Sequence, residues 1–545
     1  MGNRTSKGAR RQGGYPVAEV FLRKASGLVR DISARDVLFF NTGGINTGIG
    51  LAYIFLLGYA FYPGANQILA LVLVAALAVI QTVTYLFFTI TMPRSGGEYM
   101  FISRTLHPSV GFAMSFSYTL MMLFYSALAA AQFGKMGLAS LFQILAVKTG
   151  NMSWIGPAEW ASSPVGSFIL GTILLFAFGA ILIREMKTYL RVQMITWIIS
   201  VLGLVAVMVV LLTLSQGHFA DAFNAYAKDF INDPNPYARV ISEAKAAGYT
   251  SGGFSWGSTI AASVWPFFAL AFGAQSASFA GEIRKVGRSQ FIGTTGAVVF
   301  SAVLSLIIIG LAQAAIGSEF LGAVAYNYYV APDFSTPVTP WMHFLVTLAT
   351  NNWLWIALII LGWIFWSYYW IPVNMLYVTR VVFAWSFDRL VPAKLGEVHR
   401  KYHTPANTVI LATILTEFFL ALIVLTPYLQ TLVGIVTMTL TFVFVGLAAM
   451  AFPYVRKDLF ARTPVNYRIA GIPVMSILGL VTAGGMAFIC YRLLSDPVVA
   501  ANTTPSLIFV FGQIVLGLII FYVARAVRRR QDIDIDLAYR EIPSE

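Results

Sequence analysis

Long apolar runs, separated by short polar segments, account for most of the chain. Between residues 37 and 93 there is no aspartate, glutamate, lysine or arginine, a run of 57 residues. About 20 apolar residues are enough for a helix to cross the hydrocarbon core of a bilayer, so each run of that length predicts one span. The twelve predicted spans are residues 36–61, 66–91, 109–133, 164–183, 189–214, 257–280, 289–316, 352–385, 405–426, 429–453, 472–494 and 506–527.

Composition agrees with a protein embedded in lipid. The 545 residues are 58% hydrophobic and 11% charged, with a mean hydropathy of +0.75, whereas soluble proteins carry about 25% charged residues. The single cysteine, Cys490, excludes a disulfide framework or a cysteine metal site within the chain. We therefore predict an all-α integral membrane protein with no cofactor and no bound metal.

Positive charges gather on one side of the predicted spans. The chain carries 36 lysines and arginines and a net charge of +13. Thirty of the 36 fall in the tails and loops on one side, and cytoplasmic loops are enriched in these residues. The asymmetry predicts that both termini are cytoplasmic and that the bilayer, with no nucleic acid, explains the charge. The six on the other side are Lys135, Lys148, Lys228, Arg239, Lys245 and Arg492.

Two spans carry small and polar residues near their centres. Residues 41–50, NTGGINTGIG, hold four glycines, and each glycine lowers helix propensity by about 1 kcal/mol relative to alanine. Residues 267–278, FFALAFGAQSAS, show a similar mixture in the sixth span. A broken membrane helix exposes backbone groups, which are tolerated only inside protein or beside a cavity. These stretches therefore predict either a binding site between broken helices or close-packed helix faces.

Short motifs on several spans carry a family resemblance. They are INTGIG at 45–50, PRSGGEY at 93–99, Gly-Glu and a basic loop at 281–288, and Thr-Arg at 379–380 followed by FDRLVP at 387–392 and Thr-Pro at 404–405. In this order the chain resembles the amino acid–polyamine–organocation (APC) superfamily of permeases. The resemblance implies a leucine-transporter-like fold, which is a five-plus-five inverted repeat with broken helices 1 and 6 plus two extra helices.

The resemblance also implies a division of the chain. The implied parts are a cytoplasmic N-terminal tail (1–35), a first repeat (36–214), an extracellular loop (215–256), a second repeat (257–453), helices 11 and 12 (454–527) and a cytoplasmic C-terminal tail (528–545).

By the same resemblance, substrate would bind between the two breaks. Amides at the start of the outer half of helix 1 would hold an α-carboxylate. Free carbonyls around 269–271 would hold the α-ammonium, with Phe268 or Phe272 as an aromatic lid. The implied substrate-binding residues are Ile45, Asn46, Thr47, Gly48 and Gly50 in the first span, and Phe268, Ala269, Leu270, Ala271, Phe272 and Gly273 in the sixth.

Departures from the family pattern leave alternatives open. Asn46 stands where the family motif has glycine, and it either contacts ligand or caps the break. Gln275 stands where many members have glutamate. The fifth span lacks the lysine of some proton-using relatives, so that relay is not expected, and the coupling ion is either H⁺ or Na⁺. Ser200 and Ser367 could help hold Na⁺, or bond their own helix backbones, which is favoured.

Ionisable residues near the cytoplasmic ends predict a gate. Arg94, Glu98, Glu282 and Asp388 either form this gate network or make simple pairs at helix ends. Glu417 lies within the ninth span, where a charge costs about 2.5–3.5 kcal/mol. This cost makes Glu417 a functional candidate by default. The resemblance implies that helix 9 lies outside the family's core, so a protonated or helix-packing role is favoured for it.

Two further groups of residues have a functional and a bland interpretation. The aromatic residues 363–370 of the eighth span could stack on a ligand, but packing against lipid is favoured. The five histidines fall in or near predicted loops, where solvation is expected, and their spacing suits no metal.

These patterns favour a secondary active transporter of the cell membrane over an enzyme, since no catalytic motif is present. Neither break contains an acidic residue, so a neutral amino acid is favoured as substrate. The alternatives are a polyamine or other organocation permease and a transporter-like nutrient sensor. The sequence leaves the oligomeric state open.

Overall fold

The computed structural model describes residues 30–184, 186–334, 336–426 and 434–539. Most of the predicted tail at 1–35 lies outside these residues. Eleven helical segments in the described part are long and apolar enough to cross a membrane. They are Ala34–Phe61 (α1 to α3), Gln67–Thr91 (α4), Pro108–Thr149 (α6 and α7), Pro164–Arg184 (α9), Met186–Leu212 (α10), Val286–Ala315 (α15 and α16), Trp353–Phe387 (α19 and α20), Ala406–Leu425 (α21), Ile435–Val455 (α22), Val474–Ser495 (α24) and Thr504–Arg529 (α25).

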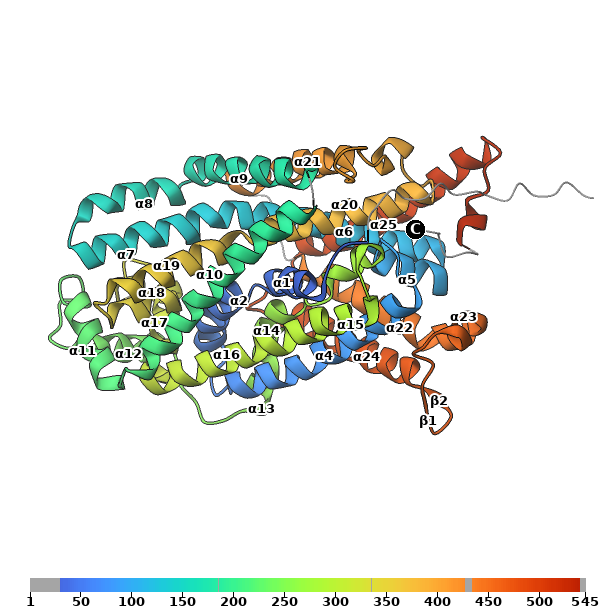
Figure 1. Ribbon diagram of the computed structural model, residues 1–545. Coiled ribbons are helices and arrows are strands. Elements are labelled where there is room, and N and C mark those ends of the chain that lie inside the picture. Colours follow the sequence, from blue (N-terminus) through green and yellow to red (C-terminus); the bar gives the residue numbers. More distant parts are fainter. Residues whose placement is uncertain (1–29, 185, 335, 427–433, 540–545) are drawn as a thin grey trace, which may run out of the picture.

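The sixth predicted span is the one that does not reach this length. Two helices of seven residues each, α13 (Trp256–Ala262) and α14 (Val264–Leu270), take its place. The remaining short elements are α5 (Glu98–Thr105), α8 (Ile155–Ser162), α11 (Gln216–Ala227), α12 (Pro236–Ala246), α17 (Ser318–Val330), α18 (Met342–Leu348), α23 (Lys457–Arg462), and the strands β1 (Arg468–Ile469) and β2 (Ile472–Pro473). The fold is thus a helical bundle with one irregular crossing (Figure 1).

The predicted end of the third span at residue 133 is wrong. α6 (Pro108–Gln132) continues through a π-helical turn into α7 (Ala139–Thr149), so one helical segment covers 42 residues. At 1.5 Å per residue this is about 63 Å, roughly twice the thickness of a bilayer core. The end of α7 therefore extends beyond the other spans.

The two predicted loops, 215–256 and 317–341, also contain helices, so that part of the sequence prediction was incomplete. α11 and α12 pack with α17 and α18 beside α7 and α8 at one end of the bundle (Figure 1). Aromatic rings hold this group together: Phe223 and Tyr237 lie 4.8 and 4.3 Å from Phe320. Burying these rings stabilises short helices that would be marginal alone. We call α8, α11, α12, α17 and α18 the cap.

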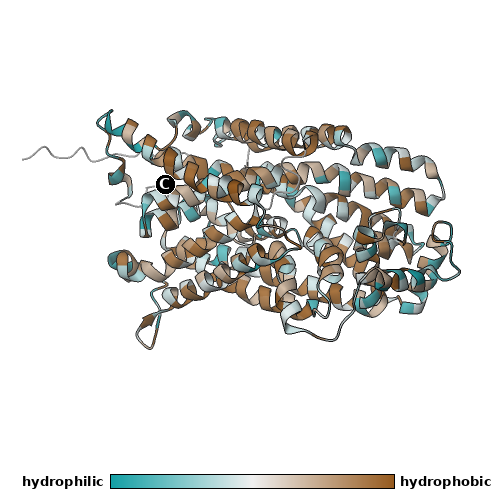
Figure 2. Ribbon diagram, turned by 180° about the vertical axis from the view of Figure 1, so that it is seen from behind, coloured by the Kyte–Doolittle hydropathy of each residue, from teal (hydrophilic) through white to brown (hydrophobic). Residues whose placement is uncertain are grey.

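Both described ends of the chain lie at the end of the bundle opposite the cap, which we call the terminal end. Residues 30–32 contact Gly281, Glu282 and Arg284 there, and Tyr539 contacts Tyr99. Hydrophobic residues follow the long helices and hydrophilic ones gather toward the ends (Figure 2). An even number of membrane crossings by the chain accounts for the position of its two described ends on the same side.

The eighth predicted span crosses as one unit with a bend. α19 (Trp353–Tyr368) and α20 (Trp370–Phe387) meet at Tyr369. Pro372 has no amide hydrogen, so the carbonyl of Tyr368 lacks its usual helical donor. The helical bonding is therefore interrupted at the start of α20, whose first residues are buried in the bundle.

Candidate functional site

The break in the first span is one residue wide. α1 (Ala34–Ile45) ends at Asn46, which has left-handed backbone angles (φ 54°, ψ 62°), and α2 (Thr47–Tyr53) starts at the next residue. The Asn46 Nδ2 donates to the carbonyl of Trp366 over 2.9 Å, and its Oδ1 accepts from the Ile49 amide over 3.4 Å. Both ends of the side-chain amide are bonded within the protein. Of the two roles considered for Asn46, ligand contact and capping of the break, this arrangement corresponds to capping.

The break in the sixth span is much wider. The helical bonding of α14 ends where the Ala271 amide donates to the Phe267 carbonyl, and it resumes at the Ala277 amide, which donates to the Ala274 carbonyl. From there the chain forms two 3₁₀ turns, Gln275–Ser278 and Ala280–Glu282. The backbone at the predicted residues of this span therefore departs from a regular helix.

The two breaks lie against each other. A β-carbon at Gly50 would lie 2.3 Å from the Ala269 Cβ, and one at Gly44 would lie 2.4 Å from Gln275 Oε1. Asn41 ties α1 to the sixth span, because its Nδ2 donates to Ser276 Oγ and its Oδ1 accepts from the Ser276 amide, over 2.8 and 3.0 Å. The structure thus brings the two predicted groups of residues together.

Not every predicted residue faces the space between the breaks. A β-carbon at Gly48 would lie 2.4 Å from the Trp366 ring, and one at Gly273 would lie 2.5 Å from Val298. These two glycines permit close packing against α19 and α16 (Gly296–Ala315). The close-packing interpretation therefore applies at Gly48 and Gly273. The backbone amides at the start of α2 remain those of a helix N-terminus.

An aromatic cluster surrounds the breaks. Trp370, at the start of α20, donates its Nε1 hydrogen to the Gly44 carbonyl over 2.8 Å. The rings of Phe268, Phe272 and Tyr125 lie 5.4, 5.6 and 5.8 Å from the Trp370 ring. Both predicted lid residues are members of this cluster.

The favoured interpretation of the aromatic cluster of the eighth span, packing against lipid, is wrong. All five of its residues are buried inside the bundle: Trp363, Trp366, Tyr368, Tyr369 and Trp370. Helical periodicity could not orient a span with aromatic side chains on every face. Pro372 was the available sign, since a proline bend commonly marks an irregular site in a membrane helix.

A buried amide pair lies beside the breaks and was missed as a site. Gln275 Nε2 donates to Asn374 Oδ1 over 3.0 Å. Among the described residues, Gln275 Oε1, Asn374 Nδ2 and the Thr47 hydroxyl are buried without a partner. The pair therefore offers one free acceptor and one free donor, whichever way the two amides are turned. Buried polar groups are normally bonded, so these atoms mark a place for a polar ligand.

The two residues of the predicted ion site have different hydrogen-bond partners. Ser200 on α10 shares a hydrogen bond of 3.0 Å with the Tyr369 hydroxyl. Ser367 donates to the Ile364 carbonyl of its own helix over 2.7 Å and lies against Gly137. The two hydroxyls thus face different neighbours, and Ser367 has the backbone bond that the sequence favoured.

The predicted gate residues separate into distinct arrangements at the terminal end. Arg380 binds Glu282 through Nε and Nη2 over 2.7 and 3.0 Å. Arg104 binds Asp388 through Nη2 over 2.8 and 2.9 Å. Sequence reasoning missed these two arginines as partners, because each pair joins segments far apart in the chain.

The other two gate residues are arranged differently. Glu98 accepts hydrogen bonds from two tyrosine hydroxyls. Arg94 donates through Nη1 to the carbonyl of Pro93 over 3.0 Å. The four predicted residues thus share one end of the bundle without forming a single network among themselves in the described contacts.

A backbone latch closes the terminal end beside these pairs. The amides of Asp31 and Ile32 donate to the Glu282 carbonyl, and the Arg284 amide donates to the Ile32 carbonyl, over 2.9 to 3.1 Å. The Asp31 carboxylate also forms ion pairs with Lys187 and Arg284. The segment before α1 is therefore bonded directly to the segment after the wide break.

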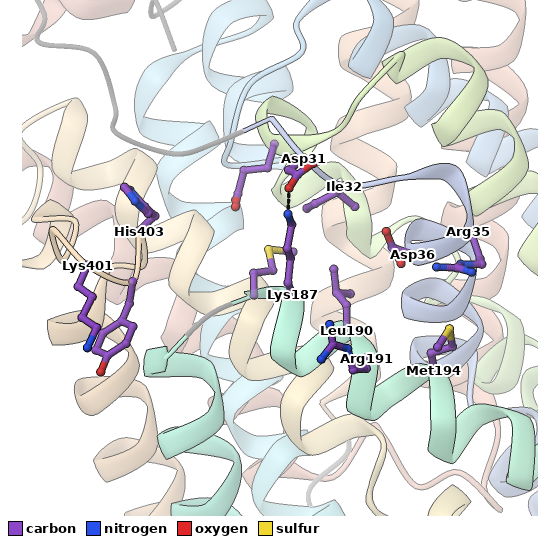
Figure 3. Close-up of a pocket in the computed structure, with 13 residues that line it drawn as sticks. Asp31, Ile32, Arg35, Asp36, Lys187, Leu190, Arg191, Met194, Lys401 and His403 are labelled. Carbon is purple, nitrogen blue, oxygen red and sulfur yellow. Dashed lines mark ion pairs between the residues drawn. The ribbon is translucent and has the colours of Figure 1, made fainter.

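A cavity of about 550 Å³ opens beside the latch, between α1 and α10. Figure 3 shows the Asp31–Lys187 ion pair in its centre, with Lys401 and His403 across the opening. Its lining residues are Asp31, Ile32, Arg35, Asp36, Met186, Lys187, Leu190, Arg191, Met194, Glu282, Lys401, Tyr402 and His403. Because it reaches Glu282 beside the wide break, it is a candidate opening toward the terminal side.

Two isolated candidates lie away from the breaks. Glu417 on α21 accepts from the Thr172 hydroxyl of α9 over 2.5 Å, the helix-packing arrangement. The solvated environment expected for the histidines is wrong for His343, which is buried in α18 and stacked 3.8 Å from the Trp363 ring.

The comparison with protein families agrees with this architecture. The family model described as amino acid permease matches residues 32–521. The chain belongs to the amino acid permease family, within the APC superfamily, and is a multi-pass membrane protein of a transporter family. A search of curated proteins found no match.

Proposed function

We propose that this protein is a secondary active transporter that moves a neutral amino acid across the cell membrane by alternating access. The observation that carries the proposal is the meeting of two broken helices around buried, unpaired, uncharged polar atoms. Such half-helix ends at the middle of a bundle are the usual binding sites of secondary transporters.

Each polar end of an amino acid has a complementary group at the breaks. The amides of Thr47 and Gly48 begin α2, and helix N-terminal amides favour an anion such as an α-carboxylate. The carbonyls that end α14 and the free Gln275 Oε1 suit an α-ammonium group. The aromatic cluster around Trp370 then bounds the side chain of the substrate.

The absence of charge at the breaks supports a neutral side chain. Residues 41–50 and 267–278 contain no aspartate or glutamate. A polyamine or other organocation would leave its additional positive charge without a partner, and a buried unpaired charge is costly. The polyamine alternative is therefore less well supported.

Both termini are proposed to face the cytoplasm. The described ends of the chain, near Arg30 and Tyr539, lie at one end of the bundle, and 30 of the 36 lysines and arginines are assigned to that side by the predicted spans. The backbone latch would then close the cytoplasmic side, and the cavity beside it would become the exit when the latch opens.

Counterflow in proteoliposomes tests this function directly. Purified protein is reconstituted into proteoliposomes, and these are loaded with one unlabelled amino acid at a time. Uptake of the labelled form is then followed at equal pH on both sides of the membrane. We expect counterflow for neutral amino acids. If no amino acid exchanges while the protein remains folded and monodisperse, the proposed function is wrong.

A matched pair of glycine variants ties this activity to the breaks. Gly48→Leu places a side chain against the Trp366 ring, whereas Gly310→Leu, within α16, enters open space. Counterflow should be lost in the first and retained in the second. Equal activity of the two variants would remove the helix 1 break from the site.

A further inference from the structure

Glu98 at the start of α5 is a buried carboxyl group held between two tyrosines. Its side chain is 1% exposed. Tyr85 of α4 donates to Oε1 over 2.9 Å, and Tyr377 of α20 donates to Oε2 over 2.8 Å. Glu98 thus links two long helices that lie far apart in the sequence.

The environment of Glu98 differs from that of the other two buried carboxylates at this end. Glu282 and Asp388 are each bound by an arginine. In the described part of the chain, no lysine, arginine or histidine forms an ion pair with Glu98. A buried carboxylate without a cation is costly, and protonation removes that cost.

Within the described residues, the side chains that interact with this carboxyl are uncharged tyrosines. Tyr85, Tyr377 and Tyr118 of α6 surround it. Phe442 of α22 covers the cluster, with its ring 5.9 Å from Tyr85 and 5.8 Å from Tyr118. Burial raises the pKa of Glu98, and hydrogen bonds from its own backbone amide, Tyr377 and Tyr85 oppose this rise only in part. The site therefore favours binding of a proton.

Glu98 is also connected to the wide break. Gly96, two residues before Glu98, donates its amide hydrogen to the Ser278 carbonyl over 2.8 Å. The loop before α5 thus forms a short antiparallel bridge with the second half of the sixth span. On the other side, Tyr377 lies one helical turn from Asn374, which bonds Gln275. Two short paths thus join this carboxyl to the candidate substrate site.

We propose that Glu98 is the proton-binding site that couples substrate movement to a proton gradient. This inference rests on the proposed transport function. One proton binds the carboxylate and changes its charge from −1 to 0, and the same proton leaves when the carboxyl ionises. The two tyrosines donate to different oxygens of the carboxylate. When one of these oxygens is protonated it becomes an O–H donor, so the tyrosine facing it changes from donor to acceptor. Protonation therefore alters the link between α4 and α20.

Proteoliposomes with separately controlled gradients test the site. Labelled substrate uptake is measured under an inward proton gradient with the membrane potential clamped, and internal acidification is followed with a pH-sensitive dye. Wild-type protein should accumulate substrate and acidify the interior. Glu98→Gln should retain counterflow at equal pH but lose at least tenfold in both gradient-dependent signals. Glu417→Gln, at a carboxyl that accepts a hydrogen bond from Thr172 of α9, is the matched control and should retain them.

The outcomes separate this inference from the transport proposal. Proton-driven accumulation by Glu98→Gln would overturn the inference, as would wild-type counterflow with no response to a proton gradient. Absence of counterflow in the wild type would instead overturn the transport function on which the inference rests.

Tyr377→Phe provides a test that does not require the Glu98 variant to fold. The Tyr377 hydroxyl stabilises the ionised carboxylate, so its removal should raise the pKa of Glu98 further. The pH of half-maximal proton-driven uptake should move upward, with counterflow retained. An unchanged pH profile would contradict the assignment.

Discussion

The two breaks at the centre of this permease are built in different ways. The break in the first span is one left-handed residue, Asn46, whose own side chain caps the helix that follows. The break in the sixth span extends from Ala271 to Ala277, and its support comes from other helices. Asn41, Gln290 and Asn374 all bond residues of this second break.

This difference separates a locally encoded break from one held by tertiary contacts. Asparagine is among the few residues that adopt left-handed backbone angles and also act as N-caps. The sixth span has no comparable residue at its break, so its shape depends on partners from α1, α15 (Val286–Gln290) and α20. We expect the first break to respond to local substitutions and the second to distant ones.

Gly50→Leu should have the largest effect, because it forces apart the place where the two breaks meet. A β-carbon there would already lie 3.2 Å from the Ala269 Cα and closer to its Cβ. Overpacking of this kind costs about 1–3 kcal/mol. Counterflow should be abolished and the unfolding temperature lowered. Gly512→Leu on α25, where a β-carbon meets open space, is the control; similar losses in both would show a general effect on insertion.

Asn41→Ala should be next in size. It removes bonds to the Ser276 hydroxyl, the Ser276 amide and the Gly293 carbonyl. A buried group left without its partner costs about 1–3 kcal/mol. Hydrogen exchange should increase at residues 275–279, although the change lies in the first span. If exchange rises only in α1, the second break does not depend on this distant contact.

Asn46→Ala should be milder and confined to the first break. Loss of an N-cap costs about 0.5–2 kcal/mol, whereas glycine at the same position costs only a few tenths. Glycine also accepts the left-handed angles of this residue. Thermal unfolding of Asn46→Ala and Asn46→Gly should therefore differ, with Ala the less stable. Both variants lose the bond to Trp366, so the opposite order would contradict the role assigned here to the left-handed capping position.

The smallest effect concerns the pH dependence of stability at Glu98, which lies next to the loop that supports the second break. Its raised pKa means that the folded protein binds this proton more tightly than the unfolded chain does. The contribution of this proton to the free energy of unfolding is present in full below about pH 4.5, the ordinary pKa of a glutamate. It is lost as the pH rises through the raised pKa of Glu98 in the folded protein. Glu98→Gln should flatten that part of the profile of unfolding temperature against pH, and an unchanged profile would contradict it.

Motifs and composition were sufficient to find the two breaks and the residues around them. They did not show which neighbouring helix each of these residues faces. Glycines 44 and 50 do lie between the breaks, but Gly48 and Gly273 face α19 and α16. Four glycines in one stretch predict a weak helix without saying which side each one presents. Ser200 and Ser367 illustrate the same limit, since their spacing cannot show that they contact different helices.

The sequence alone determined the membrane class, the long spans, the two irregular stretches and the family, because hydrophobic run length and short motifs are local properties. Tertiary structure alone decided which buried carboxylates have arginine partners and which has tyrosines. It also revealed the Gln275–Asn374 pair and the helices of the cap. Each of these depends on contacts between segments about a hundred or more residues apart, or on surfaces that become buried only when other helices cover them.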